Sequence, residues 1–229
     1  MFPWFDFNGI DSRSFTGLWI TKLPGIARPQ ERVKQEKIPG RAGDVTITEG
    51  DDVYESYLRE CVVTVSKDVD FDGLTDWLKG AGEVVFSNEP NRRYKARIVN
   101  GITFDRISND LRQATIPFYC EPYKMQEPKE DDITLTADGT VYNPGNMVSR
   151  PIIEITGTGA GSVTIGNYTM AFENLPGVLV VDCDAEIITV SDGDWDGKWT
   201  GDYFRLAPGS NTVDLDNCTI VITPNWRWV

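Results

Sequence analysis

The chain contains no histidine among its 229 residues, and this absence removes several common kinds of active site. Histidine is the usual general base in proteins, the partner of nucleophilic serine and cysteine, and the commonest side-chain ligand of transition metals. A pair of carboxylates could still hydrolyse a glycosidic bond. On this basis we expect a protein that is not an enzyme and that needs no cofactor.

Long apolar runs are also missing. A stretch such as Gly177–Val181 falls far short of the roughly 20 residues that cross a bilayer. The start of the chain, Met1–Asp6, lacks the basic segment of a secretory signal. Positive charge is scarce as well, because 22 Lys and Arg stand against 35 Asp and Glu, a net charge of −13. We therefore expect a soluble protein, synthesised in the bacterial cytoplasm, that binds no nucleic acid and inserts into no membrane.

The few cysteines suggest buried thiols. They fit no zinc or redox motif, and no two form a Cys-x-x-Cys pair. We interpret them as reduced thiols in a packed core, although an even count also permits a disulfide. The four are Cys61, Cys120, Cys183 and Cys218.

The charge is unevenly divided along the chain. Residues 1–128 carry 17 Lys and Arg against 20 Asp and Glu, a net of −3. Residues 129–229 carry 5 against 15, a net of −10. The stretch Pro128–Asp132 between them is charged and begins with proline, as domain boundaries often do. We expect two domains, residues 1–128 and 129–229.

The first half is predicted to be β structure with one helix. Asp70 is a good N-cap, and Phe71, Leu74, Trp77 and Leu78 then fall on one helical face. An Asn-Gly pair at residues 8–9 indicates a hairpin turn. Strands are predicted over residues 18–23, 45–48, 54–66, 83–87, 93–99 and 112–121.

The second half is predicted to be an antiparallel sandwich, because short β-branched segments alternate with Gly, Asn, Asp and Pro turns. Gly157–Gly161 superficially resembles a dinucleotide-binding loop, but a strand and not a helix follows it. Strands are predicted over residues 133–136, 151–156, 162–165, 168–172, 178–182, 187–190, 203–206, 212–215 and 218–223.

The segment Ile38–Asp44 reads as a rigid corner on this β scaffold. Pro39 fixes φ and donates no backbone hydrogen bond, whereas Gly40 and Gly43 permit positive φ. The polar run before it is either a solvated loop or part of an extended hairpin, and its mixed charges can set the register between subunits. The candidate interface residues are Arg28, Glu31, Arg32, Lys34, Glu36 and Lys37.

These pieces occur in the order and spacing of one family. In the N-terminal half the pieces are Phe7-Asn8-Gly9, the corner, a helix at Leu74–Gly80, a strand and turn at Val84–Pro90, and Ile116–Tyr123. In the C-terminal half they are Asn143–Asn146, Ser149–Ile155, Asp182, Phe204–Leu206 and Pro208–Asn211. The chain resembles, over essentially its whole length, the distal tail proteins of long-tailed (siphovirus-type) bacteriophages and prophages. The strongest element is Ile38, Pro39, Gly40, Arg41, Gly43 and Asp44.

The resemblance implies a mainly β fold, with an N-terminal β-sandwich-like domain that carries one short α-helix and a C-terminal galectin-like antiparallel β-sandwich. It implies a virion structural protein at the tail tip, a baseplate hub whose N-terminal domain forms a hexameric ring. The implied partners are copies of the chain itself, the tail tube protein, the tail-tip (tail-associated) protein and receptor-binding proteins. Two other functions stay open: a lectin-like module that binds host carbohydrate and, more distantly, a glycosidase.

Two weaker patterns lie close together in the C-terminal half. Asp192, Asp194 and Asp196 match the first three ligands of a calcium loop, but Tyr203 stands where the loop requires Glu, so a solvated acidic turn is the alternative. The aromatic rings of Trp195 and Trp199 could stack on a sugar or pack within their own loop.

Overall fold

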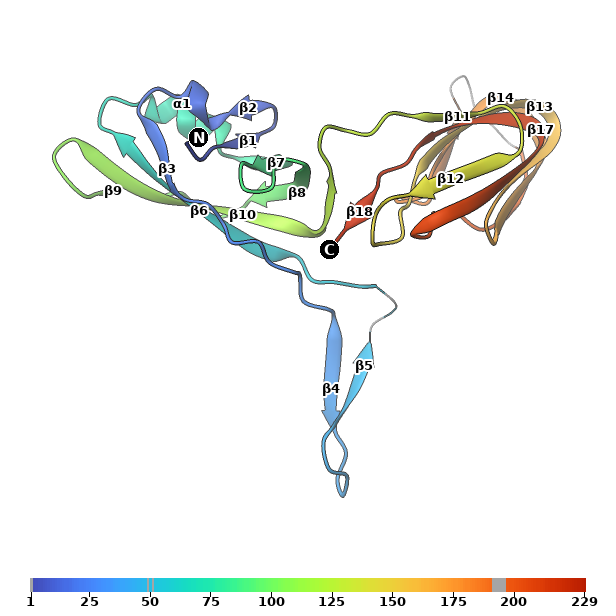
Figure 1. The fold of residues 1–229 in the computed structure, drawn as a ribbon, viewed down its shortest axis with the longest axis horizontal. Helices are drawn as coiled ribbons and strands as arrows, with labels where there is room; N and C mark the ends of the chain where they lie inside the picture. Colours follow the sequence, from blue (N-terminus) through green and yellow to red (C-terminus); the bar gives the residue numbers. More distant parts are fainter. Residues whose placement is uncertain (1, 49, 51, 191–196) are drawn as a thin grey trace. The chain divides into compact units, whose positions relative to one another are not determined.

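The computed structural model describes residues 2–48, 50, 52–190 and 197–229. The chain divides into two compact units, residues 1–127 with Val229 and residues 128–228, and each has its own hydrophobic core. Both are antiparallel, and α1 (Phe71–Trp77) is the one α-helix in the described residues (Figure 1). The predicted fold class, mainly β with one short helix and two β regions, is confirmed. In the same part of the chain no helix is long and apolar enough to span a membrane.

The N-terminal sheet has the strand order β2-β1-β7-β8-β10-β6-β3, and β9 pairs with β10. Its core side chains alternate along the strands, as in β10, where Ala114, Ile116 and Phe118 are buried. The strands are β1 (Phe5–Phe7), β2 (Ile10–Asp11), β3 (Leu18–Lys22), β6 (Tyr57–Ser66), β7 (Gly80–Phe86), β8 (Arg92–Ile98), β9 (Asp105–Arg106) and β10 (Leu111–Gln126).

Helix α1 begins where the sequence predicts. The carboxylate of Asp70 accepts a hydrogen bond from the Gly73 N–H at 3.0 Å, which caps the first turn. Of the three residues expected to be buried against the sheet, Trp77 and Leu78 are buried, whereas Phe71 is only partly buried. Seven residues cannot form a stable helix alone, so packing against the sheet must hold α1 in place.

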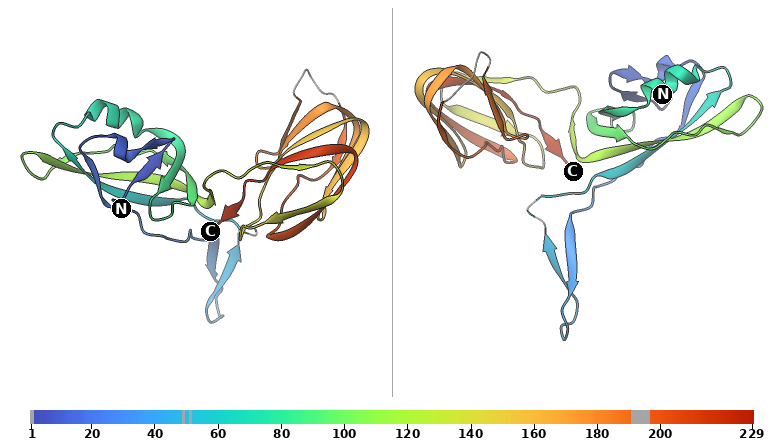
Figure 2. Two further views of the ribbon diagram at one scale, coloured as in Figure 1. Left: turned by 45° about the horizontal axis from the view of Figure 1, so that its top comes forward. Right: turned by 180° about the vertical axis from the view of Figure 1, so that it is seen from behind.

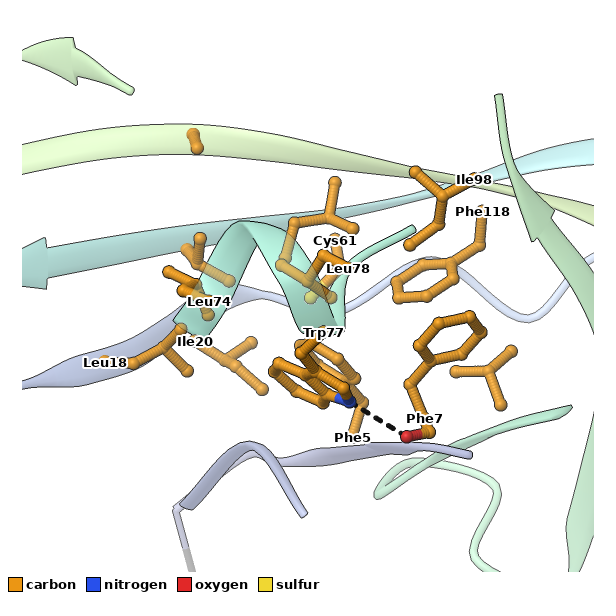
Figure 3. Packing of buried hydrophobic residues seen from close by; sticks show 14 of the residues in the cluster. Phe5, Phe7, Leu18, Ile20, Cys61, Leu74, Trp77, Leu78, Ile98 and Phe118 are labelled. Carbon is orange, nitrogen blue, oxygen red and sulfur yellow. Dashed lines mark hydrogen bonds between the residues drawn. The ribbon is translucent and has the colours of Figure 1, made fainter. Parts of the chain in front are cut away.

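Trp77 packs α1 against the N-terminal core (Figure 3). Its indole stacks between Phe5, with ring centroids 5.3 Å apart, and Phe15, at 4.7 Å. Its Nε1–H donates to the buried carbonyl of Phe7 at 2.9 Å. The helix therefore closes the core over β1 through both ring stacking and a buried hydrogen bond.

Strand β10 is longer than predicted. We expected it to end at Glu121–Tyr123, but it continues to Gln126 after a register shift between Cys120 and Lys124. Pro122 lies in this irregularity, where a residue without a backbone N–H is tolerated. The strand thus carries Tyr123 and Lys124 beyond the point at which proline would otherwise have stopped it.

The C-terminal sheet has the order β11-β17-β13-β14-β15, with β12 also on β17 and β16 also on β14. Strands β13, β14 and β17 are continuous where the sequence predicts two short strands each. Residues from both ends of β13, Ile153 and Val163, are buried in one core, so the sheet curls over itself. The strands of this sheet are β11 (Ile133–Leu135), β12 (Gly139–Asn143), β13 (Ile152–Ile165), β14 (Tyr168–Asp182), β15 (Ile187–Val190), β16 (Trp199–Gly201) and β17 (Gly209–Thr223). The short strand β18 (Arg227–Trp228) belongs to the C-terminal unit but not to this sheet.

Two further details differ from the sequence-based expectation. Strands β12 and β16 were not predicted. The segment Tyr203–Leu206 is not a strand, because its ladder is limited to a single bridge between Ser149 and Leu206. β16 has only three residues, and β12 begins with glycine and ends with asparagine, which favour turns, so neither stands out in the sequence.

Replacing Gly157 with alanine is expected to destabilise the protein by about 1–3 kcal/mol, because overpacking strains a filled core. This glycine lies at the bend of β13, where an added Cβ would lie 2.8 Å from the carbonyl oxygen of Asn217 and 2.9 Å from Leu175. Thermal unfolding of the full chain measures the effect. Gly101→Ala is the control, since no atom would lie within 4 Å of its Cβ. Equal melting temperatures for the two variants would contradict the expectation.

Candidate functional site: the charged arm and its root

Strands β4 (Val33–Lys37) and β5 (Asp44–Thr48) form a separate two-stranded sheet, which we call the arm (residues 33–48) (Figure 1 and Figure 2). Every residue of the arm is exposed except Val33 and Val45, which are partly shielded. A lone two-stranded hairpin is marginally stable in water. The arm therefore has no core of its own, and much of both faces is free to contact another molecule.

The predicted corner is the tip of this arm. The Arg41 N–H donates to the carbonyl of Ile38 at 3.1 Å, and Gly40 has a φ of 82°. Proline at the second position and a glycine of positive φ at the third define a type II turn. Ile38 at the tip is 47% exposed, so the tip presents apolar surface between charged strands.

The charged candidates lie along one stretch of chain and do not gather into a cluster. Lys34, Glu36 and Lys37 are on β4, where Lys34 and Glu36 form an ion pair. Arg28, Glu31 and Arg32 precede the arm. The Arg28 guanidinium lies 3.3 Å from the Glu31 carboxylate and donates to the Tyr54 hydroxyl at 3.2 Å, and the Arg32 N–H donates to the Val53 carbonyl at 2.9 Å.

The two segments that join the arm to the sheet, residues 24–32 and 52–56, form what we call the root. Side chains of the sheet and its β7–β8 turn hold both segments. On one side, Arg59 Nη2 donates to the Gly25 carbonyl at 3.2 Å and Asn88 Nδ2 to the Pro24 carbonyl at 2.9 Å. On the other, the Tyr123 hydroxyl donates to the Asp52 carbonyl at 2.6 Å. The root is thus anchored at three backbone carbonyls.

A buried ionic network lies behind these anchors. Arg59 is 2% exposed, and its Nη2 lies 2.9 Å from Glu89 Oε2. The Tyr94 hydroxyl donates to the same oxygen at 2.6 Å, and Lys124 Nζ lies 3.2 Å from Oε1. The guanidinium also lies over the ring of Tyr94, 4.3 Å from its centroid, and over Phe86. One carboxylate therefore holds together groups from β6, β8 and β10.

This environment favours the charged form of Glu89. Burial alone would raise the pKa of its carboxyl, but hydrogen bonds from Tyr94 and Arg59, with the charges of Arg59 and Lys124, hold that pKa below its ordinary value. Burial raises the pKa of Tyr94, so its hydroxyl stays protonated and donates. Arg59 and Glu89 are consequently an ion pair at neutral pH.

Sequence reasoning missed this network, although one signal was present. Arg59 lies on the same face of β6 as the buried residues Cys61, Val63 and Val65. A charged residue at an inward position of a strand indicates a buried ion pair, because an unpaired charge is too costly to bury. Its partner could not be chosen from sequence, since Glu89 stands 30 residues further along.

Of the weaker candidates, Trp199 is the one that lies within the described residues. Asp192, Asp194, Trp195 and Asp196 lie outside the described residues. Trp199 is in β16, half-buried, with its ring edge-to-face against Tyr203 at 5.5 Å, so it packs within the C-terminal unit. Within the ranges that the structure covers, no three His, Cys, Asp or Glu side chains gather around a point where a metal ion could bind.

The match between this chain and known proteins comes from the comparison with solved structures. No family model and no curated protein sequence matches the chain. Among solved structures, the crystal structure of the Dit protein (gp 19.1) of phage SPP1 is similar, with a TM-score of 0.74 and 16% identity, and the match covers 100% of both chains. That structure is presented as a paradigm of the hub of the adsorption apparatus in phages that infect Gram-positive bacteria. The chain therefore has, from end to end, the fold of SPP1 Dit, a siphophage distal tail protein, and the resemblance drawn from its sequence is confirmed at the level of fold.

Proposed function

We propose that this protein is a structural hub of a phage tail tip, and that its N-terminal unit forms a hexameric ring with five further copies. The observation that carries the proposal is the similarity to SPP1 Dit over 100% of both chains, which includes both units and not a single common domain. Fold similarity alone does not determine function, so the proposal also draws on the surface of this chain.

The arm supports an assembling role. A closed ring of identical subunits needs two different surfaces that complement each other. The arm offers one such surface, because its strands carry both positively and negatively charged side chains and its tip presents an exposed Ile38. Its lack of a core also means that a neighbouring subunit would stabilise it. We assign the interface to Arg28, Glu31, Arg32, Lys34, Glu36 and Lys37, with the tip turn held in shape by the Ile38–Asp44 motif.

The chemistry of the chain supports a role without catalysis. Burial raises the pKa of the thiols of Cys61, Cys120 and Cys183 to about 12, so at neutral pH they are not thiolate nucleophiles. With no histidine in the sequence, no imidazole base is present to activate a serine.

In this proposal residues 1–128 form the ring and residues 129–229 anchor host-adhesion parts. The partners are the tail tube protein on one side and the tail-tip protein and receptor-binding proteins on the other, which places the protein at the tail tip of the virion. The net charge of −10 in the C-terminal part suits a component of a tail that delivers DNA, because acidic surface does not retain DNA.

The mass of the purified protein in solution tests the proposal. Size-exclusion chromatography with light scattering is expected to give six times the mass of one chain at high concentration. Excision of residues 33–48 is expected to abolish the large species while circular dichroism still reports the β fold. A monomer at every concentration that binds glycans on an array would instead favour the carbohydrate-binding alternative, and turnover of a polysaccharide would favour the glycosidase.

A charge exchange on β4 gives a finer prediction. The double variant Lys34→Glu with Glu36→Lys keeps the ion pair within the strand but reverses the pattern that a neighbour meets. We expect the association constant to fall by about tenfold or more, because like charges that face each other across an interface are costly. Sedimentation velocity at low salt measures this. The matched exchange of the exposed pair Lys67 and Asp110 is the control, and equal effects from both exchanges would argue against the arm as the interface.

A further inference from the structure

We infer that the buried Arg59–Glu89 pair positions the arm, by holding both segments of the root against the N-terminal sheet. The pair itself lies in the core and touches no arm residue. It acts through the side chains and carbonyls around it, so Arg59 and Glu89 are positioning residues. The positioning of the arm is independent of the proposed function, and only its effect on ring assembly rests on that function.

The first root segment is held through Arg59 directly. The same nitrogen, Nη2, lies 2.9 Å from Glu89 Oε2 and 3.2 Å from the Gly25 carbonyl oxygen. Its other donors, Nε and Nη1, make no well-aligned hydrogen bond among the described residues, although the Tyr57 side chain also interacts with the guanidinium. The orientation of the guanidinium toward Gly25 therefore depends on the Glu89 carboxylate and on the aromatic rings beneath it.

The second root segment is held through β10. Lys124 contacts the other oxygen of Glu89, at 3.2 Å, and fixes the part of β10 that follows its register shift. The adjacent residue, Tyr123, donates to the Asp52 carbonyl and packs its ring against Tyr54, with centroids 6.2 Å apart. Both oxygens of one carboxylate are thus linked, through neighbouring residues, to the two segments that lead into the arm.

The contacts between the two root segments are local. The Arg32 N–H donates to Val53 and the Glu55 N–H to Gln30, at 2.9 and 2.8 Å, and the Arg28 side chain donates to the Tyr54 hydroxyl at 3.2 Å. The β6–β10 ladder behind it, by contrast, is continuous over ten residue pairs. Loss of the Glu89 charge should therefore release the root well before the sheet, because local opening begins where contacts are few.

Hydrogen–deuterium exchange of the full chain tests this inference. In Glu89→Gln, which keeps the side-chain shape and removes the charge, exchange at the Arg32 and Glu55 amides is expected to accelerate about tenfold relative to the Val63 amide of β6. The double variant Asn88→Ala with Tyr123→Phe removes two root anchors without altering the ion pair, and it should give the same pattern. Glu89→Asp keeps the charge and should restore part of the protection.

The control is Asp110→Asn, which removes an exposed ion pair of 2.9 Å in the same unit and should leave root exchange unchanged. Unchanged exchange at Arg32 and Glu55 in Glu89→Gln, or uniform acceleration across root and β6 in both the single and double variants, would overturn the inference. A loosened root in a variant that still forms rings would leave the inference standing and contradict the role of the arm in assembly.

Discussion

Replacing Trp77 with alanine is expected to destabilise the N-terminal unit by about 3–5 kcal/mol, the range for deleting a large buried aromatic side chain. The change removes the ring that lies between Phe5 and Phe15 and leaves the carbonyl of Phe7 without the donor it has in the structure. A buried acceptor that loses its partner adds a desolvation cost to the loss of packing.

Chemical unfolding of the full chain measures this effect, and the two compact units provide an internal reference. The transition of the N-terminal unit should shift to lower denaturant while that of the C-terminal unit stays in place. Trp19→Ala is the matched control, since Trp19 is 51% exposed and should cost less than about 1 kcal/mol. Similar losses for Trp77 and Trp19 would show that α1 is not held by the contacts described above.

Replacing Glu89 with alanine is expected to cost about 3–5 kcal/mol, because it leaves Arg59 buried without a counter-charge. Asp110→Asn, which removes an exposed ion pair, should cost no more than about 1 kcal/mol. A double variant in which apolar side chains of similar size replace both Arg59 and Glu89 should recover much of the loss, because no charge is then left unpaired. Urea unfolding at neutral pH measures all three.

The same carboxylate should make stability depend on pH. The pKa of Glu89 is lower in the folded protein than its ordinary value of 4.5, so its contribution is complete above about pH 4.5 and is lost as the pH falls through the folded value. Wild-type protein should therefore lose stability in acid more steeply than Glu89→Gln, in which that position no longer titrates. Parallel curves of unfolding free energy against pH would contradict a role for this ion pair.

Local signals in the sequence predicted the N-terminal elements well. The helix was predictable because Asp70 caps it and Leu74, Trp77 and Leu78 repeat at helical spacing. Strand β6 was predictable because Cys61–Val65 is a run of apolar and β-branched residues. In both cases the information lies within one turn or one strand, which is the range over which propensity and periodicity operate.

The long strands and the root were beyond such reasoning. Pro122 and the Gly157–Gly161 segment look like chain breakers, yet β10 and β13 pass through them as irregularities that long-range pairing supports. Long-range strand pairing determines whether a strand continues through such residues, and the local sequence does not specify the pairing partner. The Arg59–Glu89 pair depends on the same long-range information, because it joins β6 to the β7–β8 turn.

The exposed arm also has a consequence for the newly made chain. Open hydrogen-bonding edges and the exposed Ile38 and Ile47 make a hairpin liable to pair with the wrong strand and aggregate. Lysines at the edge of a sheet oppose such pairing, and β4 carries Lys34 and Lys37. These charges would thus oppose the formation of fibres by the newly made chain before it assembles with other subunits.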